Sequence, residues 1–383
     1  MAGASERKLE SALSAISYYF SGDEAIAEGA IAAGCRYYAG YPITPATEIF
    51  ETITSRFREI GAVSMQMEDE IASICSCIGA SWAGAKAMIA TSGPGFSLMQ
   101  EAIGYAVITE TPIVIVDVQR TGPSTGQATR VGSGDIMQAR WGTHGAMPII
   151  ALSAWSVQEL YDQTIDAFNF AEKYRVPVFL MAEEATAHLR ERMNIPEEIK
   201  LFDREKKAGV APFGTEESDG VPPMPVFGEG EKLLVTGSTH DAYGIRKTVD
   251  PLAQEKLVTR LHSKIMNNRE KIIEYEEHYL KDADIAVICY GFTARSSLFA
   301  IERLREEGKK VGMLRLKTLW PFADRAISNI GSRVKRILVP EMNMGQVVGE
   351  IVKYTSCEVV PYNQMNGEVI HPHTIIEQLR ALL

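Results

Sequence analysis

The chain has 383 residues, of which 46% are hydrophobic and 23% charged, and these values are ordinary for a globular protein of two or three domains. Its formal net charge is −10 at pH 7, and its lysines and arginines form no basic cluster. Because nucleic-acid binding depends on basic side chains that displace counterions from phosphates, we expect no nucleic-acid partner. No apolar run approaches the ~20 residues that span a membrane, so we expect a cytoplasmic protein without membrane association.

The chain begins with a short extension over residues 1–21 and then alternates between helix-like and strand-like segments up to about residue 190. Asp23 can cap a helix over residues 24–33, which Gly34 ends. The strands that we expect in this domain, residues 22–190, cover residues 35–41, 62–67, 85–90, 113–118, 148–152 and 176–181. Further helices are expected over residues 46–60, 69–82, 96–108 and 157–173. The alternation predicts an α/β fold with a parallel sheet covered by helices on both faces.

The pattern loosens over residues 191–283, which we interpret as a connector. Residues 214–230 are rich in glycine, proline and acidic residues and predict a long exposed loop. Residues 252–280 are polar with mixed charges, which predicts a helix on the surface rather than in a core. A second α/β domain is expected over residues 284–383, with strands at 285–290, 311–316, 336–339 and 358–360.

Five cysteines bear on redox chemistry and metal binding. Their count is odd, and no two are spaced as Cys-x-x-Cys. This argues against a disulfide framework, a zinc site or a cysteine-bound iron–sulfur cluster, and the scattered histidines show no metal-ligand spacing either. We therefore expect no metal in this chain, and free thiols, mostly buried, at Cys35, Cys75, Cys77, Cys289 and Cys357.

Polar residues follow the first four expected strands, where ligands bind in parallel α/β sheets. Thr44, Glu68, Ser92 and Arg120 stand 24, 24 and 28 residues apart, close to the length of one strand–helix–strand unit. We expect them to gather along one edge of the sheet.

Each of these four residues also has a simpler interpretation. Glu68 begins an acidic run of three residues that could stabilise a helix N-terminus, worth ~0.3–1 kcal/mol for each acid. The role of Thr44, between two prolines, could be limited to shaping the turn. Ser92 could belong to an anion-binding nest or to a tight connection between a strand and a helix. Arg120 could pair with an acid on the surface. Spacing alone leaves these alternatives open.

A polar and aromatic loop over residues 134–145 contains Asp135, Arg140 and His144. Long loops are often functional, but the sequence predicts no catalytic geometry for this one.

Four segments together resemble a known family. They are GYPITP at 40–45, QMEDEIAS at 66–73, TSGPGFSLM at 91–99 and QRTGPSTG at 119–126. In this order they resemble the α subunit of 2-oxoacid:ferredoxin oxidoreductases, most of all the 2-oxoglutarate branch, called 2-oxoglutarate synthase. The resemblance runs from about residue 22 to the C-terminus, and four long motifs in order are far more specific than any one alone.

The resemblance implies a pyrimidine-type thiamine-diphosphate domain followed by a transketolase C-terminal-like domain. Glu68 is then expected to meet the ring nitrogen N1′ of thiamine diphosphate, and Thr44 and Arg120 to hold the carboxylate of the 2-oxoacid, so these three are the expected catalytic residues. The other expected cofactor-binding residues are Tyr41, Pro42, Ile43, Ser92 and Gly93. The segment LVPEMNMGQ at 338–346 stands at the signature turn of the second domain, for which we expect a role in assembly and none in catalysis.

The resemblance also predicts partners. The chain contains no Gly-Asp-Gly motif with a later asparagine, so the diphosphate, its Mg²⁺ and a [4Fe-4S] cluster are expected on a β subunit, with the active site at the interface. Because the chain begins close to the first motif, we expect a separate γ subunit for coenzyme A, together with a ferredoxin-like δ subunit and ferredoxin. The predicted substrate is 2-oxoglutarate. The alternatives are a branched-chain 2-oxoacid or pyruvate, or a non-catalytic scaffold with the same fold.

Overall fold

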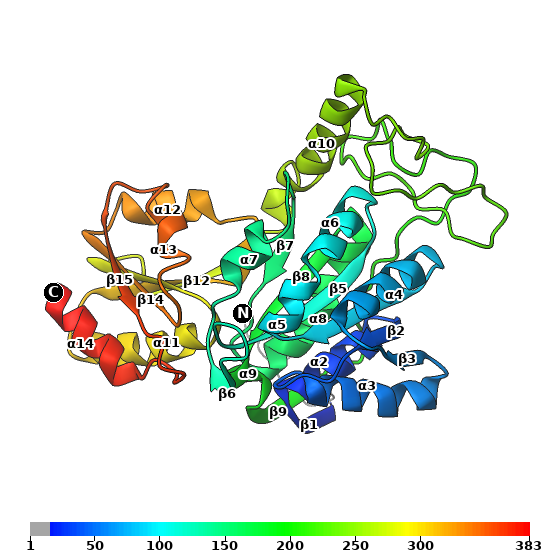
Figure 1. The fold of residues 1–383 in the computed structure, drawn as a ribbon. Helices are drawn as coiled ribbons and strands as arrows, with labels where there is room; N and C mark the ends of the chain where they lie inside the picture. The colour runs from blue at the N-terminus through cyan, green and yellow to red at the C-terminus, as the bar shows by residue number, and fades with distance from the viewer. Residues whose placement is uncertain (1–15) are drawn as a thin grey trace, which may run out of the picture.

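The computed structural model describes residues 16–383, which form two α/β units side by side and an irregular connector that projects from them (Figure 1). Most of the expected extension over residues 1–21 lies outside the described residues. Its last part forms strand β1 (Ile16–Ser21), which pairs antiparallel with β9 (Arg190–Ile195). The predicted cap at Asp23 is wrong, because the side chain of Ser21 accepts the amide hydrogen of Glu24 and caps the first helix.

The sheet of the first unit has the strand order β13-β7-β8-β5-β4-β2-β3, and β6 pairs with β5. The pairs from β7 to β3 are all parallel, as the alternation predicted. The central strands are continuous apolar runs because both faces of the sheet are covered. The strands are β2 (Cys35–Gly40), β3 (Val63–Gln66), β4 (Lys86–Thr91), β5 (Ile113–Thr121), β6 (Gln127–Val131), β7 (Ile150–Leu152), β8 (Pro177–Glu183) and β13 (Thr318–Trp320).

Helices cover both faces of this sheet. One face carries α2 (Gly22–Ala32), α3 (Thr47–Ile60) and α8 (Val157–Tyr174). The other carries α4 (Glu70–Trp82), α5 (Gly93–Leu98) and α6 (Gln100–Ile108). Two short helices, α7 (Ile136–Trp141) and α9 (Glu184–Ala187), follow strands β6 and β8.

The second unit has the strand order β10-β12-β11-β14-β15. Its strands are β10 (Tyr275–His278), β11 (Ile285–Cys289), β12 (Val311–Leu316), β14 (Arg336–Glu341) and β15 (Glu358–Asn363). One face carries α11 (Gly291–Glu306) and α14 (Pro372–Leu382), and the other carries α12 (Asp324–Gly331) and α13 (Val348–Ile351).

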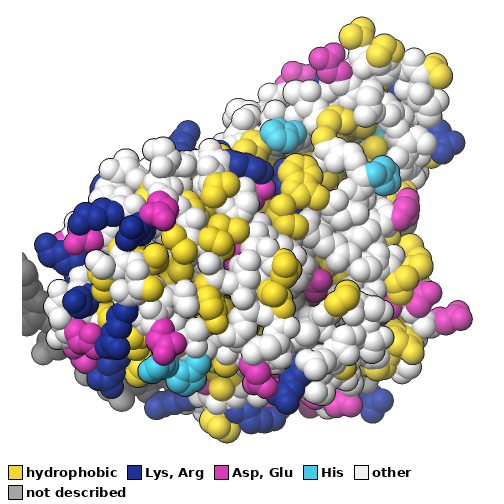
Figure 2. Space-filling model, turned by 60° about the vertical axis from the view of Figure 1, so that its left-hand side comes forward, with side chains coloured by type: hydrophobic (Ala, Val, Ile, Leu, Met, Phe, Trp, Pro, Cys, Tyr) yellow, Lys and Arg dark blue, Asp and Glu magenta, His cyan; other side chains and the backbone are white. Residues whose placement is uncertain are grey.

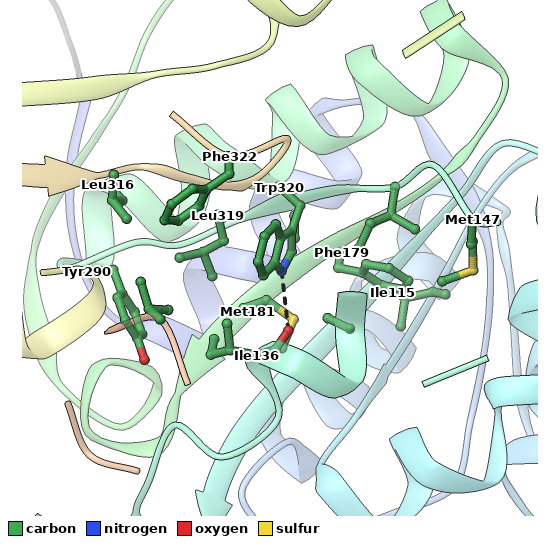
Figure 3. Packing of buried hydrophobic residues seen from close by; sticks show 14 of the residues in the cluster. Ile115, Ile136, Met147, Phe179, Met181, Tyr290, Leu316, Leu319, Trp320 and Phe322 are labelled. Carbon is green, nitrogen blue, oxygen red and sulfur yellow. Dashed lines mark hydrogen bonds between the residues drawn. The ribbon is translucent and has the colours of Figure 1, made fainter. Parts of the chain in front are cut away.

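The two units share one hydrophobic core. Strand β13 follows β12 of the second unit but pairs with β7 of the first, so the chain crosses between the two sheets. Trp320 on β13 packs between Phe322 and the apolar face of the first sheet, and its indole nitrogen donates to the carbonyl of Ile136 at 3.3 Å (Figure 3). A continuous core of this kind holds the units in one relative position.

The connector differs from its prediction in two ways. Helix α10 (Pro251–Met266) occupies only the first half of the stretch expected to be helical; a 3-10 turn η1 (Arg269–Lys271) and β10 follow it. Residues 214–230 are not simply an exposed loop, because Met224 and Val226 are buried and the ring of Phe227 lies 5.8 Å from that of Trp82. No helix within residues 16–383 is long and apolar enough to cross a membrane.

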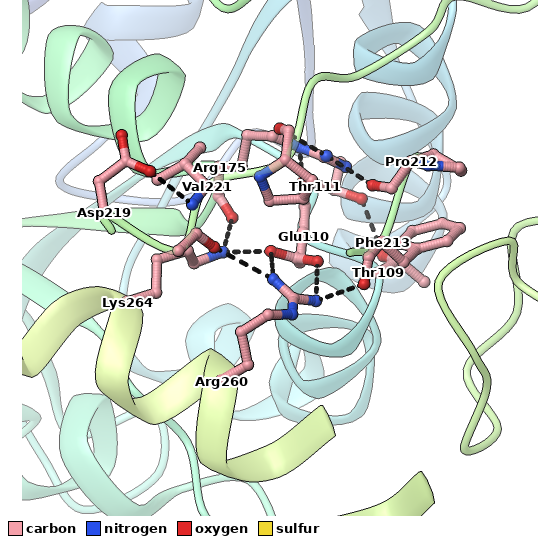
Figure 4. A network of polar contacts seen from close by, with 12 residues as sticks. Thr109, Glu110, Thr111, Arg175, Pro212, Phe213, Asp219, Val221, Arg260 and Lys264 are labelled. Atoms are coloured by element: carbon pink, nitrogen blue, oxygen red, sulfur yellow. Dashed lines mark hydrogen bonds and ion pairs between the residues drawn. The ribbon is translucent and has the colours of Figure 1, made fainter. Parts of the chain in front are cut away.

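A buried charge network attaches α10 to the first unit (Figure 4). The carboxylate of Glu110, just after α6, accepts hydrogen bonds from Arg260 at 2.5 and 2.9 Å and from Lys264 at 2.7 Å. Lys264 also donates to the backbone carbonyl of Arg175 at 2.9 Å. The prediction of a surface helix therefore holds for the outer face of α10 only, since its inner face buries Lys264 with a counterion.

Candidate active site

The four polar positions that follow the strands lie along one edge of the first sheet. Strands β5, β4, β2 and β3 are neighbours in that order and run parallel, so their carboxyl ends meet there. Thr44, Glu68 and Ser92 follow β2, β3 and β4, and Arg120 is the second-last residue of β5. The periodicity of the sequence therefore predicted the juxtaposition correctly.

Arg120 is directed inward rather than toward a surface acid. Its side chain is 8% exposed, and its Nη1 atom donates to the backbone carbonyl of Thr44 at 2.6 Å. Its Nε atom is buried without a hydrogen-bond partner among the described residues. Burial lowers the pKa of Arg120, and the nearby carboxyl of Asp135 opposes that shift. The guanidinium therefore retains an unused donor that can bind an anion.

Glu68 plays no part in capping the helix that follows it. Asp69 is the N-cap of α4, and its carboxylate accepts the amide hydrogen of Ala72 at 2.8 Å. Glu70 is buried and accepts a hydrogen bond from Thr91 at 3.3 Å. Glu68 is exposed, and none of residues 16–383 donates a hydrogen bond to its carboxylate or pairs with it. The helix-cap interpretation therefore applies to Asp69, and Glu68 remains available.

The turns after β2 and β4 complete this edge. Tyr41 is 44% exposed, and Pro42 and Ile43 are half-buried beside it. Ser92 is buried, and its Oγ has no hydrogen-bond partner within residues 16–383. Gly95 allows a close approach of chain segments, because a Cβ there would lie 2.1 Å from Thr91 Oγ1.

A cavity of about 710 Å³ opens beside Arg120, between the two units. Gly93 and Asp135 line it from the first unit, and the signature turn at 342–346 lines it from the second. Asn343 donates to the carbonyl of Ser133 at 2.8 Å, which attaches this turn to the first unit. The turn therefore links the two units of the chain and also forms a wall of the cavity.

Asp135, which lines the cavity, is paired with a second carboxyl, Asp117, that the sequence did not indicate. Asp117 on β5 is fully buried, and neither of its oxygens has a hydrogen-bond donor among the described residues. Burial raises the pKa of Asp117 well above its usual range, and the neighbouring Asp135 adds a smaller effect in the same direction. Burial likewise raises the pKa of Asp135 to about 6, although Asp117 and Arg120 oppose it. Two adjacent carboxyls of this kind share a proton near neutral pH. The sequence feature that could have indicated this pair is Asp117 itself, a single acid within an otherwise apolar strand.

The rest of the polar loop lies elsewhere. Arg140 donates to the carbonyl of Met147 at 2.9 Å and stacks over Trp141 at 3.9 Å. His144 lines a separate cavity with Tyr105. Of the three loop residues singled out from the sequence, only Asp135 reaches the site.

The chain is similar to proteins of known function along most of its length. Residues 28–259 match the family described as "Pyruvate flavodoxin/ferredoxin oxidoreductase, thiamine diP-bdg", and residues 283–375 match "Pyruvate:ferredoxin oxidoreductase core domain II". The 2-oxoglutarate synthase subunit KorA of Methanocaldococcus jannaschii is 48% identical over 362 residues, which cover 93% of this chain and 97% of that protein. The ketoisovalerate oxidoreductase subunit VorB of Methanothermobacter marburgensis is 34% identical, covering 94% and 96%.

A solved structure has the same fold. It is described as 2-oxoglutarate:ferredoxin oxidoreductase from Magnetococcus marinus with 2-oxoglutarate, coenzyme A and succinyl-CoA bound. It superimposes with a TM-score of 0.89 at 33% identity, covering 95% of this chain, which spans 65% of the length of that chain.

Proposed function

Because the chain belongs to the 2-oxoacid:ferredoxin oxidoreductase family, we propose that it is the α subunit of a 2-oxoglutarate:ferredoxin oxidoreductase, also called 2-oxoglutarate synthase. The enzyme converts 2-oxoglutarate, coenzyme A and oxidised ferredoxin into succinyl-CoA, CO₂ and reduced ferredoxin, or runs in reverse, and the chain acts only within a complex. The observation that carries this proposal is that Glu68, which has no hydrogen-bond partner within residues 16–383, lies at the same sheet edge as Arg120 and Thr44, which are hydrogen-bonded to each other.

Thiamine diphosphate fits the polar groups that this edge leaves without partners. The carboxylate of Glu68 is exposed, and the hydroxyl of Ser92 is buried and lacks a partner among the described residues. We assign to Glu68 a hydrogen bond with N1′ of the aminopyrimidine ring, worth ~1.5–3 kcal/mol for a charged partner. The turn 41–43 and Gly93 would hold the rest of the ring. When bound, the cofactor supplies the nucleophilic carbon and the electron sink for decarboxylation.

Arg120 and Thr44 are assigned to the 2-oxoacid carboxylate. A planar guanidinium can bind a carboxylate through two parallel hydrogen bonds, and Arg120 lines the cavity with an unused Nε donor. Its bond to the carbonyl of Thr44 fixes its direction before substrate arrives. Holding the substrate in one orientation supplies part of the rate acceleration, because the reacting groups then meet without further loss of entropy.

A β subunit is proposed to cover this edge and to carry the diphosphate, its Mg²⁺ and the [4Fe-4S] cluster. Large hydrophobic side chains are exposed on β3 and on the segments that follow β2, β3 and β4, namely Tyr41, Val63, Met65, Ile71 and Leu98. Strand β3 also ends the sheet, so its outer backbone groups are available for contacts. On the face drawn in Figure 2, hydrophobic side chains are spread over the middle and most charged ones lie toward the margins. Exposed large hydrophobic side chains that lie together are typical of protein interfaces.

The proposed complex also contains γ and ferredoxin-like δ subunits and transfers electrons to ferredoxin. The matched Magnetococcus structure is described with coenzyme A and succinyl-CoA bound, which supports coenzyme A as a substrate of the proposed complex. A cytoplasmic location belongs to the same proposal, supported by five cysteines without a disulfide.

Replacement of Glu68 by Gln tests the proposed role of this carboxylate. In the assembled complex, Glu68→Gln should lower turnover of 2-oxoglutarate by about 10²–10⁴-fold, because an amide cannot hold a proton at the ring nitrogen as a carboxylate does. The matched control is Glu51→Gln, which alters an exposed glutamate on α3 and should leave turnover unchanged. Near-wild-type turnover in Glu68→Gln would favour the scaffold alternative.

A substrate panel tests the choice of 2-oxoacid. The 48% identity to a 2-oxoglutarate synthase subunit, against 34% to a ketoisovalerate oxidoreductase subunit, supports 2-oxoglutarate. Reduction of ferredoxin by the purified complex should be faster with 2-oxoglutarate than with pyruvate or 2-oxoisovalerate. Faster turnover of either competitor would contradict this part of the proposal.

A further inference from the structure

A buried acid, Asp23, lies at the start of α2. This helix covers the face of the first sheet opposite the one that α4 covers. Asp23 is completely buried, and neither of its carboxylate oxygens has a hydrogen-bond partner within residues 16–383. Ser21 already caps the helix, so Asp23 is not needed there. An ionised carboxylate without partners in a protein interior is strongly destabilised unless a cation or a proton neutralises it. Burial raises the pKa of Asp23, so the position calls either for a proton on this carboxyl or for a cation beside it.

His188 and Glu48 meet Asp23 from two other elements. His188 ends the short helix α9, and Glu48 lies in the first turn of α3. The Nε2 atom of His188 lies 3.8 Å from an oxygen of Asp23 and 3.8 Å from an oxygen of Glu48. Both distances are too long for hydrogen bonds. The imidazole nitrogen therefore faces two carboxylates without bonding directly to either.

The other imidazole nitrogen has a defined partner. Nδ1 of His188 lies 3.3 Å from an oxygen of Glu184, one helical turn earlier. A carboxylate at Nδ1 holds the proton there and leaves the lone pair of Nε2 directed at Asp23 and Glu48. The same carboxylate–histidine arrangement orients metal-ligating histidines in many proteins.

We propose that Asp23, Glu48 and His188 bind one divalent transition-metal ion, for which Zn²⁺ is the appropriate probe. Their three ligand atoms lie within 4.8 Å of one another. Ligands of a tetrahedral zinc ion lie ~3.3–3.6 Å apart, so the side chains would draw closer together on binding. One imidazole and two carboxylates suit zinc or manganese and leave a coordination position for water. His188 is 36% and Glu48 53% exposed, so an ion can enter from solvent.

The ion would connect three segments of the first unit. It would link the starts of α2 and α3 to the end of α9, and α3 begins directly after the turn that contains Thr44. A bound ion would therefore hold the start of α3 in place, and with it the preceding turn that contains Thr44. The site depends on residues 23, 48, 184 and 188 and not on the proposed reaction.

A proton on His188 is the competing occupant. The hydrogen bond that His188 donates to the Glu184 carboxylate raises the pKa of His188 to about 9, with Asp23 and Glu48 also favouring the charged ring against its burial. Glu24 adds a further negative charge near Asp23. Zinc must displace this proton, so its affinity should increase with pH.

Isothermal titration of the full-length, metal-stripped chain with ZnCl₂ at pH 8.5 tests the proposal. Wild type should bind one zinc ion that His188→Ala loses. Glu184→Gln should weaken that binding by about 10–100-fold, because it removes only the outer partner of the imidazole. His373→Ala is the control, since His373 and Glu377 form an exposed pair at 3.4 Å that lacks a buried acid.

Glu48→Gln guards against variants that fail to fold, because Glu48 is half-exposed and its replacement leaves the buried groups unchanged. This variant should retain the wild-type circular dichroism spectrum and bind zinc at least tenfold more weakly. Equal zinc binding by wild type and His188→Ala, or no binding by wild type at pH 8.5, would overturn the proposal in favour of a protonated His188.

Discussion

The Nη1 atom of Arg120 lies 2.6 Å from the backbone carbonyl oxygen of Thr44, and this hydrogen bond connects the end of β5 to the turn after β2. Strand β4 lies between these two strands, so the bond spans the crevice above it. Arg120 is thereby oriented by the backbone of the residue with which it is proposed to bind substrate. The guanidinium is fixed at one nitrogen and free at another.

Arg120→Lys should lower kcat/KM for 2-oxoglutarate by about 10–100-fold in the assembled complex. A lysine retains the charge but cannot bond to the Thr44 carbonyl and to a carboxylate in the same planar arrangement, which loses a charge-assisted hydrogen bond of ~1.5–3 kcal/mol. Steady-state kinetics should show most of the change in KM. Arg130→Lys is the control, because Arg130 forms an exposed pair with Glu368 at 2.6 Å. Unchanged kinetics in Arg120→Lys would exclude Arg120 from substrate binding.

Asp117→Asn should make the chain more stable at pH 8 than wild type, by ~1 °C in Tm for each kcal/mol recovered. Burial raises the pKa values of Asp117 and of Asp135, the latter to about 6, so the folded state binds protons that the unfolded state has already released. Stability is therefore lost as pH rises from about 4 through these folded-state pKa values. Thermal melts of wild type and variant should converge near pH 4.

A pH-independent difference in Tm between the two proteins would contradict this linkage. Glu255→Gln, at an exposed position on α10, serves as the control and should melt with wild type at every pH.

Glu110→Gln should destabilise the chain by ~3–5 kcal/mol, because it leaves Lys264 and Arg260 without their buried counterion. Burial alone would raise the pKa of Glu110, but the charges of Lys264 and Arg260 outweigh it and hold that pKa below the usual range. The stabilisation is therefore present above the unfolded-state pKa of ~4.3 and is lost as pH falls below it.

Urea denaturation at pH 7 measures this effect. The control is Glu306→Gln, in the exposed pair with Arg303 at 2.9 Å, for which a change below ~0.5 kcal/mol is expected. Similar losses in the two variants would show that the network around Glu110 is no stronger than a surface pair.

Two glycines in neighbouring helices should respond in opposite ways to alanine. Gly95→Ala should destabilise the chain by ~1–3 kcal/mol, since the new Cβ would lie 2.1 Å from Thr91 Oγ1 and 2.3 Å from Glu70 Oε1. Gly79→Ala, in the middle of α4, meets nothing within 4 Å and should stabilise by ~0.4–1 kcal/mol. The free energies of unfolding from urea titrations measure both. A neutral Gly95→Ala would mean that the turn after β4 relaxes freely.

Some features of the site were determined by the sequence alone. The spacing of Thr44, Glu68, Ser92 and Arg120 matches the repeat of parallel strands and helices, and parallel strands bring their carboxyl ends to one edge whatever the details of packing. The apolar runs, such as the segment that became β5, also predicted buried strands correctly, because a strand covered on both faces needs no polar alternation.

Local roles among adjacent residues were not determined in this way. The sequence offers three consecutive acids at 68–70, and each could cap the following helix. Only the backbone at Asp69, extended at φ −157° and ψ 179°, places that side chain over the first turn and turns Glu68 outward. In the same way, Ser21 rather than Asp23 caps α2, which leaves Asp23 buried beside His188.

The tertiary structure alone decided the groups that come from distant parts of the chain. Asp117 and Asp135 lie on either side of the β5–β6 turn, the cavity beside Arg120 needs the turn at 342–346 from the second unit, and His188 meets Asp23 across 165 residues. No local sequence pattern predicts these contacts. Periodicity determines the face of a helix or strand on which a residue lies, but not which distant side chain it contacts there. The charge and the shape of the candidate active site and of the proposed metal site were therefore set by how side chains pack between helices and strands, and not by the order of these elements along the chain.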